Sequence, residues 1–80
     1  MSTGNVLNIK ATWDDDTKVW VAESDDVPGL ITEADTVSAL VQKLKYLIPE
    51  LLNANGYTDD DEIPFKLTSE IASTTYRHAA

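Results

Sequence analysis

This 80-residue sequence has no cysteine and only one histidine, His78. Disulfide bonds are therefore excluded, and so are most of the metal sites that stabilise small domains. A chain of this length buries only about two thirds of its unfolded surface, so we expect marginal stability from its own core. Association with another chain is the remaining source of stability, and we expect a homodimer or higher homo-oligomer.

The sequence also lacks an apolar run of the ~18 residues that span a bilayer. Its first residues, Met1 to Gly4, lack the basic and apolar regions of a signal peptide. Because the sequence has no cysteine, it gives no sign of an oxidising compartment, and we expect a cytoplasmic protein.

Basic residues are few: six lysines and arginines stand against fourteen acidic residues, a formal net charge of −8. This charge repels phosphate backbones and anionic membranes, so we expect neither as a direct ligand. The negative charge would favour binding to a basic protein surface, but a role in solubility alone explains the charge equally well.

Apolar and polar residues alternate from Val6 to Trp13, which predicts a strand with one buried side. The buried side consists of Leu7, Ile9, Ala11 and Trp13. Asp14 to Thr17 form a polar hairpin loop. Because these aspartates lack the ligand spacing, glycine and later glutamate of a calcium-binding loop, we interpret them as a solvated turn rather than a metal site.

A second strand is predicted from Lys18 to Ser24, with apolar residues on both faces: Val19 and Val21 on one, Trp20 and Ala22 on the other. Pro28 and Gly29 suit the central positions of a type II turn, because proline presets φ and glycine accepts a positive φ. The following strand, Leu30 to Thr32, should therefore lie antiparallel to the second.

Apolar residues at spacings of three and four from Val37 to Leu52 predict an amphipathic helix, capped by Asp35 or Thr36. Pro49 leaves two solutions open: a kink, or a break followed by a short second helix. The helix should end near Gly56, a natural C-terminal stop.

An acidic loop, residues 57–62, precedes a strand predicted by alternation from Ile63 to Ile71. The whole chain, residues 1–80, is one domain with a core over about 6–72 and a flexible tail over 73–80. The expected fold is α+β with the order β-β-β-α-β: a four-stranded, mainly antiparallel sheet with one kinked or broken helix on one face.

One helix covers one face of a sheet, so the other face and the last strand need a partner. We predict that the edge strand or the uncovered face forms the oligomer interface. The candidate interface residues are Ile63, Phe65, Leu67 and Ile71.

The run W-D-D-D-T-K-V-W-V-A-E-S-D-D-V-P-G-L-I-T-E-A-D-T, the apolar helix, P-E-L-L-N-A-N-G and I-P-F-K-L resemble a small HicB-like family of unknown function. The resemblance covers roughly Val6 to Ile71. It implies a partial RNase H-like fold and a relationship to the antitoxins of bacterial HicA/HicB systems. Such an antitoxin binds and blocks a small basic mRNA-cleaving toxin. The sequence stops soon after its fourth strand, so the DNA-binding tail of many HicB proteins is not carried over.

The candidate partner-binding residues are Trp20, Asp25, Asp26, Pro28 and Glu33, whose acids flank the predicted turn. Aromatic residues often dominate binding energy. We assign Trp13 to the core more readily than Trp20.

No catalytic, cofactor-binding or metal-ligating residue is predicted. A two-metal nuclease needs carboxylates on the centre of its first strand, where this chain has Ile9, Lys10 and Ala11. We therefore expect a non-enzymatic protein-binding module, with an antitoxin-type neutraliser as the first hypothesis and a stand-alone structural or regulatory homo-oligomer as the alternative.

Overall fold

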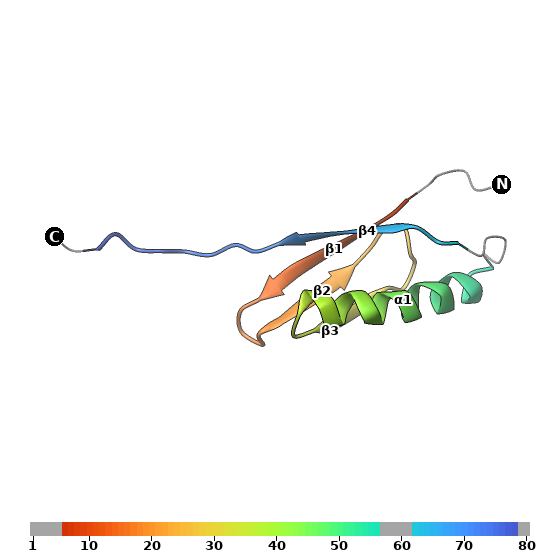
Figure 1. Cartoon of the computed structure of the whole chain (residues 1–80), viewed down its shortest axis with the longest axis horizontal. Coiled ribbons are helices and arrows are strands. Elements are labelled where there is room, and N and C mark those ends of the chain that lie inside the picture. Colours follow the sequence, from red (N-terminus) through yellow and green to blue (C-terminus); the bar gives the residue numbers. More distant parts are fainter. Residues whose placement is uncertain (1–5, 57–61, 79–80) are drawn as a thin grey trace.

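The computed structural model describes residues 6–56 and 62–78, and Figure 1 shows the chain. Three strands come first: β1 (Leu7–Asp14), β2 (Val19–Glu23) and β3 (Ile31–Ala34). One helix, α1 (Val37–Ala54), and a fourth strand, β4 (Phe65–Glu70), follow. This order confirms the predicted α+β class and the β-β-β-α-β arrangement.

The four strands form one sheet in the order β3-β2-β1-β4. β2 is antiparallel to both β1 and β3, whereas β4 is parallel to β1, with Leu7 beside Phe65. The chain therefore leaves one edge of the sheet after β3 and returns at the opposite edge. The sequence pattern predicted the fourth strand but not its place beside β1.

The pairing register decides which side of β2 lies under the helix. Ala22 lies opposite the buried Ala11 of β1, so Trp20 and Ala22 share the helix side. Val19 and Val21 belong to the other, open face. That open face is largely polar, carrying Asn8, Lys10, Thr12, Asp14, Glu23, Glu33, Lys66, Thr68 and Glu70.

The apolar stripe of α1 packs on the sheet as its spacing predicts. The buried residues form one cluster: Ile9, Ala11, Ala22, Val27, Leu30, Ala34, Leu40, Leu44, Ile48 and Leu52. Thr36 is the N-cap, because its side chain accepts a hydrogen bond of 3.0 Å from the backbone N–H of Ala39. This contact decides between the two caps left open by the sequence.

Of the two solutions proposed at Pro49, the break does not occur: α1 is continuous from Val37 to Ala54. Proline removes the donor to the carbonyl of Lys45, at a cost of ~3 kcal/mol in a regular helix. Lys45 is exposed, so water can reach that carbonyl, while the apolar stripe continues on the other side. The helix ends before Gly56, whose φ of 86° is the left-handed conformation expected of a C-terminal stop.

The helix covers the sheet unevenly. Its backbone runs closest to β3 and β2. Within the described ranges, no residue of β4 is buried, and Phe65 and Leu67 are only half-buried. After β4, residues 71–78 continue away from the body as an exposed extended tail, giving the molecule dimensions of 62 × 23 × 19 Å (Figure 1).

Residues 57–61 of the predicted acidic loop, and residues 79–80 of the tail, lie outside the part of the chain that the structure describes. Within the described part, no helix is both long enough and apolar enough to cross a membrane.

Candidate functional site

The turn after β2 is built as the proline and glycine predict. The N–H of Leu30 donates to the carbonyl of Val27 over 3.1 Å, and Gly29 has φ 85°. Val27 and Leu30 are buried, while Pro28 is exposed. The turn therefore anchors its apolar ends in the core and leaves the preceding aspartates at the surface.

Asp26 is fixed to β1 through its own carboxylate and through the hydroxyl of Ser24. Its Oδ2 accepts a hydrogen bond of 2.8 Å from the backbone N–H of Asn8. The hydroxyl of Ser24 donates to the carbonyl of Asn8 over 2.6 Å and accepts from the N–H of Asp26 over 3.0 Å. Together these bonds extend the β1–β2 pairing beyond the end of β2. Asp26 thus has a structural role that the sequence pattern does not predict, and the same holds for Asn8 and Ser24.

A hollow of about 570 Å³ lies beside this turn on the open face. The hollow is lined by residues of β1, β2, β4 and the turn: Asn8, Ile9, Lys10, Glu23, Ser24, Asp25, Asp26, Thr68 and Glu70. Four carboxylates therefore surround it, against one lysine. The alternation of polar residues along the strands predicts a polar face of the sheet. It does not predict which of these residues lie next to one another, because that depends on how the strands pair.

Two of these four carboxylates have partners. Asp26 is bonded to Asn8, and Glu70 Oε1 lies 3.1 Å from Lys10 Nζ, with both side chains more than half exposed. Among the residues that the structure describes, no ion pair involves Glu23 or Asp25. The hollow consequently keeps a negative potential, and cationic side chains are the groups that it suits.

The other predicted partner-binding residues are divided between the two faces. Glu33 lies on the open face, across β2 from the hollow, beside Val21. Trp20 lies on the helix side, half-buried, where it packs on the core. Its ring centroid is 5.3 Å from that of Trp13, at 60°. Contrary to the expectation from the sequence, Trp20 is the tryptophan that packs on the buried cluster. A partner at the hollow would not contact it.

The predicted interface residues lie along β4 and its ends. Ile63, Phe65 and Leu67 are half-buried and pack against the core, whereas Ile71 is 61% exposed. A shallow groove of about 170 Å³ separates β4 from the helix. Its lining is mostly apolar and consists of Leu44, Lys45, Ile48, Pro49, Ile63 and Phe65.

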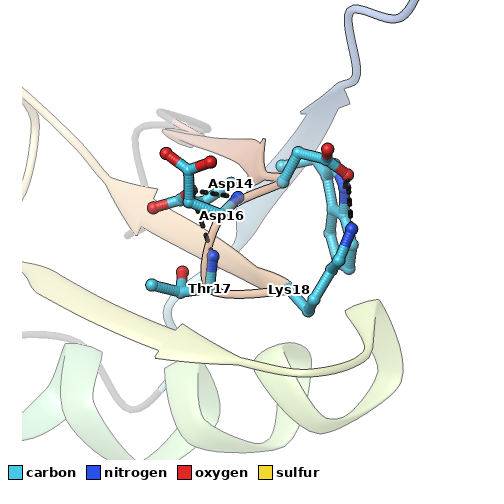
Figure 2. A network of polar contacts seen from close by, with 6 residues as sticks. Asp14, Asp16, Thr17 and Lys18 are labelled. Carbon is cyan, nitrogen blue, oxygen red and sulfur yellow. Dashed lines mark hydrogen bonds and ion pairs between the residues drawn. The ribbon is translucent and has the colours of Figure 1, made fainter.

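In the acidic hairpin loop between β1 and β2, the carboxylates of Asp14 and Asp15 bind groups of the loop and its flanking residues, and Figure 2 shows the contacts of Asp14. Asp14 Oδ1 accepts from the N–H groups of Asp16, over 3.0 Å, and Thr17, over 3.5 Å. Lys18 Nζ contacts Asp15 Oδ1 at 2.9 Å, and this hydrogen bond lowers the pKa of Asp15, helped by the indole N–H of Trp13. Lys18 adopts φ 61° to close the loop.

In residues 6–56 and 62–78, no three histidine, cysteine, aspartate or glutamate side chains converge as metal ligands would. His78 is exposed in the tail.

Comparison with known proteins identifies a family without an assigned activity. Residues 6–78 match the model of a domain of unknown function, DUF1902. A crystal structure of the hypothetical protein TTHA1013 from the extremely thermophilic bacterium Thermus thermophilus is similar, with a TM-score of 0.69 and 45% sequence identity. The match covers 91% of this chain and 100% of that one. Among curated proteins, none matches this chain.

Proposed function

The chain belongs to the DUF1902 family, and we propose that it is a non-enzymatic, HicB-like module that binds a basic protein through the acidic hollow of its open face. The hollow is the observation that carries this proposal. It is concave, its carboxylates outnumber its single lysine, and Glu23 and Asp25 have no ion-pair partner among the described residues. A lysine or arginine of a partner would supply the missing charge.

The partner that this chemistry suits is a small basic protein that acts on RNA. Such a protein must carry positive charge to bind phosphates, so an acidic surface competes for the same groups. The net charge of −8 adds long-range attraction to the local hollow. In this role the domain would be an antitoxin-type neutraliser in the cytoplasm, without cofactor, metal or direct contact with nucleic acid.

The structure shows which carboxylates of the hollow can be reversed to test binding without disturbing the fold. Reversing Asp26 would remove the bond to Asn8 and disturb the turn, so a binding defect in that variant would be ambiguous. Glu23 and Asp25 are both exposed and line the hollow. The informative variant is therefore the double reversal E23K/D25K.

The control must change the net charge equally at another site. Asp35 precedes the helix and Glu50 lies on its exposed side, and neither lines the hollow. D35K/E50K thus matches E23K/D25K in charge while leaving the hollow intact.

We expect E23K/D25K to weaken binding of the small basic protein encoded beside this gene by at least about tenfold, the equivalent of about 1.4 kcal/mol. D35K/E50K should reduce affinity much less, by the general loss of charge, and both effects should shrink as salt rises. Titration calorimetry and protection of RNA from cleavage are the measurements. Equal effects of the two variants, or a neighbouring gene that encodes no small basic protein, would contradict the proposal.

One observation favours the second candidate function, a stand-alone structural or regulatory homo-oligomer. None of the described residues pairs with the outer edge of β4. The two candidates are compatible, because the hollow lies on a face of the sheet and the free strand lies at its edge.

A further inference from the structure

The two edges of the sheet differ in how well they are protected against pairing with another strand. β3 is only four residues long, and Lys43 Nζ donates a hydrogen bond of 2.5 Å to the carbonyl of Glu33. A short strand with a covering lysine is a common protection of an edge. β4 is six residues long and continues into an extended tail, and no described strand pairs with its outer edge.

The hydrogen bonds to β1 show which backbone groups of β4 point outward. The carbonyl of Pro64 accepts from the N–H of Leu7, so the backbone groups of Pro64 point to β1. Because these directions alternate along a strand, those of Phe65, Leu67 and Ser69 point outward. The proline, which lacks an N–H, therefore does not block the outer edge.

We propose that two copies of this chain join along β4 as an antiparallel pair about a twofold axis centred on Thr68. Each tail would then run along the α1–β4 groove of the other copy. A twofold pair is self-complementary, so each residue on one strand meets the residue equally far from the axis on the other. Since the axis is perpendicular to the sheet, both helices lie on one face of an eight-stranded sheet and both hollows on the other.

Centring on Thr68 places opposite charges together on the open face. Lys66 of one copy lies opposite Glu70 of the other, and the pair occurs twice because of the symmetry. Charges of opposite sign directly across an antiparallel pair stabilise it. Registers centred on Leu67 or Ser69 place neither residue opposite an opposite charge.

The same register explains the exposed isoleucine at the start of the tail. The alternation of β4 places Ile71 on the helix side, and in the pair it lies opposite Phe65 of the second copy, at the apolar groove. In the single chain Ile71 is 61% exposed and the tail leads away from the groove of its own copy (Figure 1). A second copy in this register brings these two apolar surfaces together.

A cysteine at the axis tests the register directly, because the natural chain has no cysteine. The backbone groups of Thr68 face β1, so the two Thr68 residues would form a non-hydrogen-bonded pair with Cα atoms about 4.5 Å apart. That separation lies within the roughly 4.4–6.8 Å that a disulfide spans. T68C should therefore form a disulfide-linked dimer under mild oxidation.

K66C is the matched control. The two copies of residue 66 would be offset by four residues, about 13 Å at ~3.3 Å per residue, which is too far for a disulfide. If T68C fails to cross-link, or K66C cross-links equally fast, the proposed register is wrong.

A second test uses the two exposed isoleucines, Ile71 and Ile31, which are 61% and 78% exposed. Light scattering or sedimentation of the full chain should show a dimer that I71S weakens at least about fivefold and that I31S, at the other edge, leaves unchanged. Circular dichroism should show both variants folded. A monomeric natural chain, or a dimer weakened by I31S and not by I71S, would overturn the proposal. Neither test uses a basic partner, so the outcome is independent of the function proposed for the hollow.

Discussion

The two edges of this small sheet, at β3 and at β4, differ in how completely their side chains are buried. On the β2–β3 side, α1 lies over the strands, and the turn contributes Val27 and Leu30 to a closed core. On the β4 side, the described strand contributes only half-buried side chains, and the chain leaves as an exposed tail. One helix of this width covers about two strands, so a four-stranded sheet leaves part of its apolar surface for another molecule.

The largest expected effect compares the two sides within the core. L44A removes a fully buried side chain beneath the helix and should destabilise the fold by about 2–5 kcal/mol. L67A removes a half-buried side chain of β4 and should cost about 1–2 kcal/mol. Urea denaturation at one fixed protein concentration measures both. Equal costs would show that β4 is as completely packed as the rest, and the comparison would fail.

An intermediate effect concerns the bond that ties the turn to β1. D26A removes the acceptor of the Asn8 N–H and should cost about 1 kcal/mol, since that site is exposed enough for water to replace part of the bond. D25A, one residue earlier, should leave stability within about 0.5 kcal/mol of the natural chain. Thermal unfolding of the two alanine variants is the measurement. A larger loss in D25A would show that the free carboxylate, rather than the bonded one, holds the turn.

The smallest effect is expected in the hairpin loop, which belongs to neither side of the comparison. K18A removes the hydrogen bond that lowers the pKa of Asp15, so that pKa should rise toward its ordinary value. A lowered pKa stabilises the fold above the unfolded pKa, and the contribution disappears as pH falls through the folded value. Because the carboxyl is fully exposed, we expect no measurable change in unfolding. NMR titration of Asp15 checks the shift, and an unchanged pKa would contradict the assigned contact.

The regular elements were predictable because their information is local. The alternation in β1, the proline and glycine of the turn, and the spacing of leucines in α1 each follow from the geometry of one segment. Boundaries shifted by one or two residues: β3, for example, runs from Ile31 to Ala34 rather than ending at Thr32. The predicted partner-binding residues do not share one surface: Asp25 lines the hollow, whereas Trp20 lies on the opposite face of the sheet.

The rest of the site was not predictable because it depends on contacts between distant segments. Asp26 and Asn8 are 18 positions apart in the sequence, and their bond exists only because the turn folds back on β1. Glu70 joins the hollow because β4 pairs with β1, at the far edge from β3. The two possible faces of β2 likewise looked alike in the sequence, since both carry apolar residues.

The sequence by itself determined the elements, their order and the single buried stripe of the helix, because side-chain period and turn chemistry act within a few residues. Only the tertiary structure decided the strand order, the side of the sheet on which Trp20 lies, and the gathering of four carboxylates around one hollow. These features depend on register and on the path of the chain across the sheet. A shift of one residue in either strand pairing would turn the same side chains to the opposite face.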